Sequence, residues 1–278
     1  QAEDGIRDIG VTEFRRVLFR SLAHPPWCAA DPLVFACRED NDLHRIARAS
    51  GIPLERVATP REAVDAAAPG AGVLLLADGY PTETTPLDGN LFATASAKRL
   101  RVYVEFPSFL PGIEAGPPRG THWERGAVAS ALFAPELDPL SILAIHDCRF
   151  VPVTAAAPHI VVGRVAGFDR AVYGIPSGAF PILFDLPTEA GKGRVIVATT
   201  KLSHMVTGRY APHASWVAVW RRLLGILGDG EPASLLDWTA DVRPSFGRFE
   251  QLPADVETRS EEHTSELQSR QYLVCRLL

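Results

Sequence analysis

Three polar side chains follow short apolar segments of the chain and have the chemistry to bind a hydroxylated ligand. Asp78 and Tyr80 come after the run GVLLLA, and Glu105 ends the run LRVYVE. Carboxylate and phenol oxygens form hydrogen bonds with hydroxyl groups, and groups at the carboxyl ends of parallel strands share one crevice. We therefore predict that Asp78, Tyr80 and Glu105 contact a sugar hydroxyl. The alternative is turn capping, which an Asp-Gly pair favours locally.

A second group of reactive residues, His146, Asp147 and Cys148, ends another apolar segment. A cysteine beside a histidine becomes a nucleophile when the imidazole takes the thiol proton. Adjacent residues at the end of a strand point to opposite sides, however, so Asp147 does not easily serve both of its neighbours. We predict no catalytic residue in this chain, and His146 and Cys148 are the candidates if that prediction is wrong.

The segment HMVTGRYAPH, residues 204–213, offers Arg209 and Tyr210 for contact with a ligand or a partner. The alternative is a packed loop that anchors the helix after it. Two histidines nine residues apart on a loop are a poor metal pair. The sequence GKGR at 191–194 lacks the spacing of a phosphate-binding loop and precedes an apolar run, so it predicts a hairpin turn. We therefore predict no metal site and no cofactor.

Net charge, the length of the apolar runs and the cysteine content argue against several classes of protein. A net charge of −5 without a basic stripe argues against a nucleic-acid partner. No apolar run approaches the roughly 20 residues of a membrane span, so no membrane partner is predicted. Apart from Cys275, the cysteines are Cys28, Cys37 and Cys148, and none belongs to a CxxC pair. This pattern indicates buried free thiols, not a zinc site or a disulfide framework.

The first half of the chain alternates apolar runs with helical patterns. Runs at 32–37, 72–77 and 100–105 are β-rich, and helical spacing fills 39–51, 59–70 and 87–99. Thr59 is a candidate N-cap, with Pro60 in the first turn. Apolar strands separated by helices predict a parallel sheet that is covered on both faces. The predicted class is therefore α/β, with a flavodoxin-like sheet.

The second half has a different pattern. Residues 159–174 read as a β-hairpin, and residues 180–201 read as two strands around a turn at 189–193. The segment 213–230 has an apolar face at helical spacing, with Trp216 and Trp220 expected in the core. The hairpin is expected to join the parallel sheet as an antiparallel addition.

The order of these segments resembles the class I glutamine-amidotransferase-like domains, which are flavodoxin-like. The segments that carry the resemblance are GVLLLADGYP, LRVYVEFPSFLPG and FPILFDLPTEAGKGRVIVATTKLS. The nearest type is the non-catalytic β-galactosidase trimerisation-type domain of bacterial glycosidases. Active members carry a cysteine at a strand-to-helix elbow, G-x-C-x-G. Here Glu105, Phe106 and Pro107 occupy that place, so the resemblance implies the fold without the glutaminase chemistry.

This resemblance implies a non-catalytic structural or interaction domain from a larger bacterial carbohydrate-active enzyme, a glycosidase. The alternative is a self-contained small hydrolase with a site at the carboxyl edge of its sheet. The expected domain covers residues 22–230, and residues 231–258 are expected to link it to a downstream domain. The expected partners are that downstream domain, a second copy of the chain, or a carbohydrate.

The two ends of the chain can be encoded by inverted copies of one DNA sequence. RSEEHTSEL at 259–267 can be encoded by AGATCGGAAGAGCACACGTCTGAACTC, whose reverse complement encodes EFRRVLFRS at 13–21. Sequencing-adapter DNA read through at both ends of an insert produces such a pattern, whereas unrelated protein ends do not. We expect residues 1–21 and 259–278 to be adapter-derived, so they carry no information about the fold. A signal peptide would be lost from such a fragment, so the compartment stays open.

Overall fold

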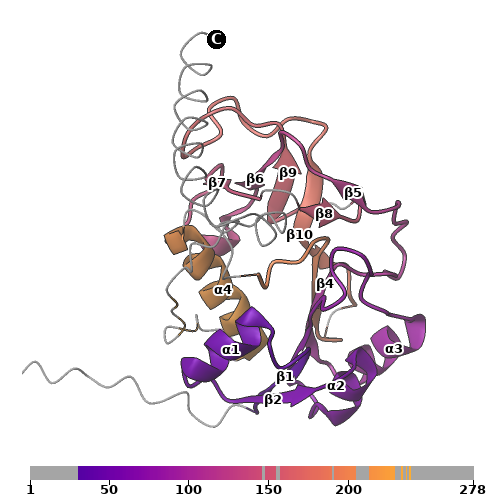
Figure 1. The fold of residues 1–278 in the computed structure, drawn as a ribbon. Helices are drawn as coiled ribbons and strands as arrows, with labels where there is room; N and C mark the ends of the chain where they lie inside the picture. Colours follow the sequence, from indigo (N-terminus) through magenta and orange to yellow (C-terminus); the bar gives the residue numbers. More distant parts are fainter. Residues whose placement is uncertain are drawn as a thin grey trace, which may run out of the picture.

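The centre of the molecule is a nine-stranded sheet with helices on both faces (Figure 1). Its strand order is β2-β1-β3-β4-β11-β10-β9-β6-β7. The computed structural model describes residues 31–145, 148–154, 157–189, 191–204 and 213–228, together with Ala233, Leu236 and Trp238. The class is α/β, as the alternation of apolar runs and helical patterns predicts.

Five neighbouring strands form a parallel half of the sheet. In sheet order they are β2 (Leu54–Val57), β1 (Leu33–Ala36), β3 (Gly72–Leu75), β4 (Arg101–Glu105) and β11 (Arg194–Ala198). The predicted parallel pairing of the runs at 32–37, 72–77 and 100–105 is confirmed. Strand β2 was not among the predicted strands, because it lies at the sheet edge, where its residues LERV are half-buried or exposed and form no apolar run.

The remaining strands of the sheet are antiparallel. They are β10 (Phe180–Leu186), β9 (Ile160–Gly163), β6 (Arg125–Val128) and β7 (Ile142–Leu143). A separate small sheet pairs β5 (Arg119–Gly120) with β8 (Arg149–Phe150). The predicted turn between β10 and β11 is confirmed, and Gly193 adopts a φ of +93° in it.

The pairing of the predicted hairpin at 159–174 differs from the expectation. Only its first half is a strand, β9, which pairs with β6 and β10 instead of with the residues that follow it. In the second half, Arg170 makes an isolated bridge to Ser141. Ala171 is buried, but Val172 and Tyr173 are 66% and 90% exposed, so these two residues do not pack against the sheet. Among the described residues of the predicted strand at 141–148, Ile142–Leu143 form the strand β7.

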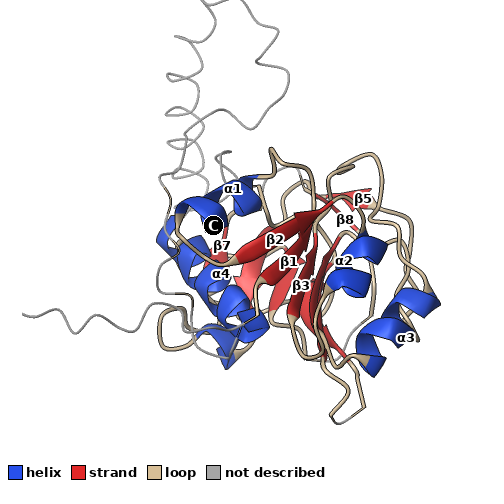
Figure 2. Cartoon of the chain, turned by 90° about the horizontal axis from the view of Figure 1, so that it is seen from below, coloured by secondary structure: helices blue, strands red, loops and turns tan. Residues whose placement is uncertain are grey.

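The helices lie on opposite faces of the parallel half (Figure 2). They are α1 (Asp42–Ala49), α2 (Pro60–Ala66), α3 (Gly89–Ala97) and α4 (His213–Gly228). A 3-10 helix, η1 (Ala131–Phe133), follows β6. Helices α1 and α4 cover the face toward which Leu33 and Phe35 point. Helices α2 and α3 cover the face of Val34 and Val73. Alternate residues of each strand thus enter two separate cores.

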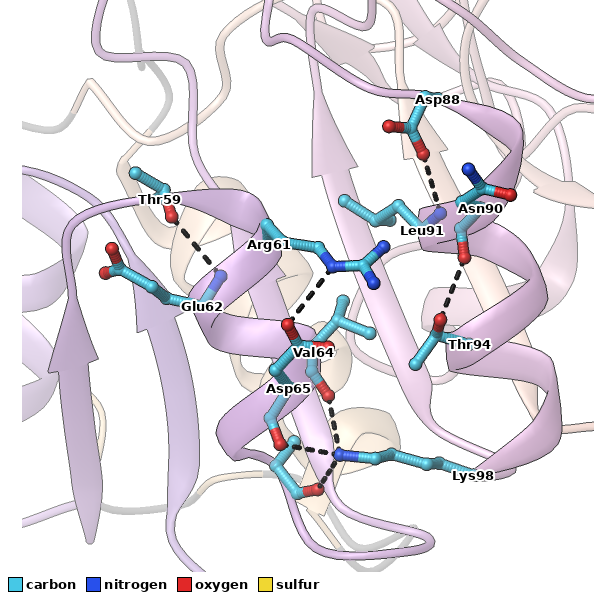
Figure 3. A network of polar contacts seen from close by, with 11 residues as sticks. Thr59, Arg61, Glu62, Val64, Asp65, Asp88, Asn90, Leu91, Thr94 and Lys98 are labelled. Carbon is cyan, nitrogen blue, oxygen red and sulfur yellow. Dashed lines mark hydrogen bonds and ion pairs between the residues drawn. The ribbon is translucent and has the colours of Figure 1, made fainter.

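Side-chain caps set the ends of α2 and α3 (Figure 3). Thr59 accepts from the N–H of Glu62 at 3.2 Å, and Asp88 accepts from that of Leu91 at 2.7 Å. The Lys98 ammonium follows α3 and donates to the carbonyl oxygens of Val64, Asp65 and Ala67. This cation satisfies the free carbonyls of α2 and suits its negative end. Helix α2 ends at Ala66, within the predicted helical segment 59–70.

Helix α4 is packed directly against the centre of the sheet. Trp216 and Trp220 are fully buried, as predicted, and the Trp220 ring meets Tyr103 of β4 at 5.3 Å between ring centroids. Gly72 lies at the start of β3, where a Cβ would overlap the carbonyl oxygen of Leu227. The absence of a side chain at position 72 lets the end of α4 approach the sheet.

Candidate functional site

The carboxyl ends of β1, β3, β4 and β11 meet at one edge of the sheet, which we call the carboxyl edge. It brings together Asp78, Tyr80 and Glu105, as the sequence predicts. The N–H of Ala77 donates to Glu105 Oε2 at 3.2 Å, and the Tyr80 ring meets Phe106 edge-on at 5.1 Å. Contact of Asp78 and Tyr80 with a sugar stays a prediction, whereas Glu105 has no exposed surface with which to make such a contact.

Glu105 is the most deeply placed of the three, with no exposed surface. Its carboxylate accepts hydrogen bonds from the N–H of Ala77 (3.2 Å), the O–H of Tyr103 (3.1 Å), the N–H of Leu202 (2.9 Å) and the O–H of Ser203 (2.8 Å). Each oxygen therefore serves one backbone donor and one hydroxyl donor. A carboxylate held in this way joins β3, β4 and the segment after β11, and it does not reach solvent.

The surroundings of Glu105 act on its pKa in both directions, and burial has the largest effect. Burial raises the pKa of Glu105, while the Lys201 ammonium and the hydrogen bonds from Ala77, Ser203 and Leu202 counteract part of that effect. Lys201 follows β11 and is only half-buried. A buried carboxyl group with fixed donors contributes to a specific packing arrangement, because loss of any member leaves another polar group without its partner.

The hydrogen bonds of Glu105 continue into helix α4. Tyr103, which donates to Glu105, packs its ring against Trp220. Trp220 Nε1 donates to the carbonyl oxygen of Leu202 at 3.2 Å, and the N–H of Leu202 donates to the Glu105 carboxylate. Glu105, Tyr103, Trp220 and Leu202 thus form a closed ring of contacts between the sheet, the helix and the segment after β11.

Phe106 occupies the strained position directly after β4. Its φ is +45°, in the left-handed region that residues other than glycine rarely adopt. Two backbone hydrogen bonds hold it there, from Thr85 N–H to the Phe106 carbonyl (2.7 Å) and from Phe106 N–H to the Ala198 carbonyl (2.8 Å). A nucleophile elbow places its reactive residue on such a turn, before a helix. Here the side chain is a phenyl ring, 1% exposed, and residues 107–118 contain no helix.

Asp78 and Tyr80 are half-buried and also have partners within the fold. Asp78 accepts from the N–H of Arg38 at 2.5 Å and from the side-chain amide of Asn41 at 3.4 Å. Asn41 is the N-cap of α1, so Asp78 supports the turn between β1 and α1. The phenol oxygen of Tyr80 accepts from the N–H of Arg149 at 2.6 Å. The structure therefore contains the turn contacts that the capping alternative expects. Each of the two side chains is also partly accessible to solvent.

The thiols near this edge are buried. Cys37 follows β1 and is 1% exposed, and burial raises its pKa to about 12, with the Asp78 carboxylate adding to the shift and Arg56 opposing it. Cys148 is also 1% exposed and belongs to the hydrophobic core. A buried, protonated thiol is a poor nucleophile. His146, Arg209 and Tyr210 lie outside the described residues.

Further polar residues of the carboxyl edge were not predicted from the sequence. Lys201, Ser203 and His204 follow β11, and the His204 ring meets Tyr80 at 5.8 Å. The pattern that reveals Asp78, an apolar run that ends in polar residues, also occurs in RVIVATTKLSH. These residues are therefore recognisable once β11 is known to be parallel to β4.

A pocket of about 530 Å³ lies beside this edge, next to the segment 149–153 that runs along Thr199 and Thr200. Its lining residues are Gly112, Ile113, Glu114, Gly116, Pro152, Val153, Thr154 and Phe180. The Arg119 guanidinium lies over the Phe180 ring, 4.9 Å from its centroid. The wall thus combines one carboxylate, a hydroxyl and an aromatic ring.

The described part of the chain offers neither a metal-ligand cluster nor a membrane helix. Within it, no three residues among His, Cys, Asp and Glu are grouped so that they could hold a metal ion. None of the described helices has both the length and the apolar character needed to cross a membrane.

Comparison with known proteins identifies no family for this chain. No protein-family model matches it, and no curated protein matches it. Among solved structures it is similar to Agd3, described as a novel carbohydrate deacetylase, with 12% sequence identity and a TM-score of 0.48. The similarity covers 71% of this chain and 32% of that protein, so the matched part is about a third of the longer chain.

Proposed function

We propose that this domain is a non-catalytic structural and interaction module of a larger bacterial carbohydrate-active enzyme, a glycosidase. The observation that carries the proposal is Phe106 at the elbow after β4, beside a fully buried Glu105. The resemblance to the glutamine-amidotransferase-like, β-galactosidase trimerisation-type domain supports the same assignment. In an active member this elbow would present a thiolate to the substrate.

The chemistry at this edge supports a structural role. Glutamine hydrolysis at an elbow needs an exposed nucleophile above a helix N-terminus. Position 106 offers a buried phenyl ring, and the nearest carboxylate, Glu105, is enclosed by four donors. Neither side chain is able to attack a bound substrate. Glu105 and Phe106 therefore give no support to the hydrolase alternative at the carboxyl edge.

Recognition is the function that remains for the carboxyl edge. Asp78 and Tyr80 are half-buried side chains there, and Glu114 with Phe180 lines the neighbouring pocket. Carboxylates and aromatic rings suit sugar hydroxyls and apolar sugar faces respectively. We propose a carbohydrate, a second copy of the chain or a downstream domain as the partner, with Arg209 and Tyr210 as further contact residues.

The proposal is tested with the 278-residue protein on glutamine and a panel of aryl glycosides, by release of ammonia and of the aryl alcohol. We expect no turnover above buffer. Turnover that falls about tenfold in Asp78→Asn or Tyr80→Phe, at an unchanged melting temperature, would assign catalysis to this edge and overturn the proposal. The genomic DNA beyond residue 258 tests the parent enzyme: a helical barrel domain supports it, and an immediate stop codon contradicts it.

A further inference from the structure

The edge of the sheet opposite the carboxyl edge holds a hydrogen-bonded chain of serine, histidine and aspartate. Ser130 Oγ lies 2.8 Å from His159 Nδ1, and His159 Nε2 lies 2.9 Å from Asp185 Oδ2. Ser130 follows β6, His159 precedes β9, and Asp185 lies near the end of β10. The three strands are adjacent and antiparallel, so their ends meet although the residues are far apart in the sequence.

The backbone holds these residues in place. The N–H of Ala129 donates to the carbonyl of His159 at 2.8 Å, and the N–H of His159 donates to the carbonyl of Leu183 at 2.7 Å. Arg194, the first residue of β11, binds the Asp185 carboxylate with two parallel bonds, Nε to Oδ1 at 2.7 Å and Nη2 to Oδ2 at 2.8 Å. A bidentate guanidinium fixes the plane of the carboxylate.

The charge of Asp185 determines which ring nitrogen of His159 carries the proton. Burial acts to raise the pKa of Asp185, but the hydrogen bonds from His159 and Arg194 outweigh it and lower the pKa to about 2. An ionised carboxylate only accepts hydrogen bonds, so Nε2 of the neutral imidazole must carry the proton. Nδ1 then has a free lone pair, and the Ser130 hydroxyl donates to it.

This polarity is that of a serine nucleophile with its base. The hydroxyl proton points at an imidazole that can accept it, and the imidazole is oriented by a carboxylate. The N–H of Leu132 also donates to Ser130 Oγ, at 3.2 Å, and would stabilise negative charge on that oxygen. In the usual serine hydrolases Nε2 faces the serine and Nδ1 faces the acid, whereas here Nδ1 faces Ser130 and Nε2 faces Asp185. The order of nucleophile, base and orienting acid is the same.

We propose that Ser130 and His159 are the catalytic nucleophile and base of a hydrolytic site for small, unhindered acyl esters, with Asp185 and Arg194 as positioning residues. Ser130 is half-buried, and the side chains of His159 and Asp185 are 13% and 38% exposed, so the group lies at the protein surface, where a small ester can reach it. This inference goes beyond the proposed function: it places chemistry at the opposite edge of the sheet, so that the non-catalytic assignment would hold for the carboxyl edge alone.

The reaction balances with water as the second reactant. Ser130 Oγ forms a bond to the ester carbonyl carbon while its proton moves to His159 Nδ1. The bond from that carbon to the alkoxy oxygen then breaks, and His159 returns the proton to the leaving alcohol. Water attacks the acyl-serine, gives its proton to His159, and releases the carboxylic acid as Ser130 regains its proton. One ester and one water become one alcohol and one acid.

The test uses a fluorophosphonate probe, which reacts covalently with activated serines, on the 278-residue protein. We expect one adduct by intact mass, and peptide mapping should place it on Ser130. The wild-type map assigns the residue even if a variant fails to fold. Ser130→Ala should lose the adduct, whereas the matched control Ser108→Ala, which removes an exposed hydroxyl, should retain it.

Turnover of p-nitrophenyl acetate gives the second measurement. Ser130→Ala and His159→Gln should lower it about tenfold or more. Asp185→Asn should slow probe labelling and change its pH profile, which a merely structural role would not do. An unlabelled Ser130, under conditions that label a known serine hydrolase, would overturn the proposal and leave the group as a structural link between strands. Glutamine and glycosides are not substrates here, so this failure is distinct from failure of the proposed function.

Discussion

The N–H of Leu202 donates to the Glu105 carboxylate at 2.9 Å, and the carbonyl of the same residue accepts from Trp220. One peptide segment therefore joins the end of β4 to helix α4. Because Glu105 is fully buried, this join is made inside the molecule, where polar groups must all be paired. A carboxylate at the end of a strand here joins a helix to the sheet.

Replacement of Glu105 by alanine should destabilise the protein by about 3 kcal/mol, because the buried N–H groups of Ala77 and Leu202 lose their acceptor. Glu105→Gln should cost less, since one amide oxygen remains. Urea unfolding measures both. The matched control is Glu55→Ala on the exposed edge strand, expected within about 0.5 kcal/mol of wild type. A cost for Glu105→Ala no larger than that of the control would contradict the network.

The raised pKa of Glu105 makes the stability of the folded protein depend on pH. The folded state binds this proton more tightly than the unfolded state does, so the contribution of Glu105 to stability declines as pH rises above its ordinary value of 4.5. Wild type should lose stability relative to Glu105→Gln over that range, as measured by urea midpoints from about pH 4 upward. The opposite slope would show that the donors and Lys201 outweigh burial.

Asp185 should have the opposite pH dependence. Its pKa is lowered to about 2, so its stabilisation is present above its ordinary value of 3.8 and is lost as pH falls from there toward 2. The difference in melting temperature between wild type and Asp185→Asn should shrink over that interval. Asp65→Asn, in an exposed ion pair with Arg61, is the control and should show a smaller effect. A constant difference across the interval would refute the assignment.

Cys37 should resist thiol reagents in the native protein. Burial keeps its pKa at about 12, so at about pH 8 it is protonated as well as inaccessible. After brief treatment with N-ethylmaleimide, peptide mapping should find Cys37 and Cys148 unmodified, and both should react once denaturant is added. Rapid native labelling of Cys37 would mean that the carboxyl edge opens readily.

Gly72→Ala should destabilise the protein by about 1–3 kcal/mol, because the new methyl group overlaps the Leu227 carbonyl and forces α4 away from β3. The control is Gly89→Ala at the start of α3, where an added methyl group would meet nothing within 4 Å. It should be neutral or stabilising by a few tenths of a kcal/mol. Equal effects of the two substitutions in urea unfolding would count against close packing of α4.

The sequence by itself determined the local features of this protein. Apolar runs separated by helical spacing predict the parallel strands, Thr59 predicts the start of α2, and the spacing of Trp216 and Trp220 predicts a buried helix face. Asp78, Tyr80 and Glu105 could be assigned to one edge because parallel strands end together. Each of these inferences uses neighbours within a few residues or one repeat of the fold.

Only the tertiary structure decided which groups are exposed and which distant groups meet. A carboxylate at a strand end looks the same in sequence whether it faces solvent or four internal donors, and the donors of Glu105 include residues 97 and 98 positions away. Ser130, His159 and Asp185 are separated by 29 and 26 residues, and only the register of three antiparallel strands brings them together. The register of these strands depends on which side chains are buried over the whole sheet, so a short segment of sequence does not predict it.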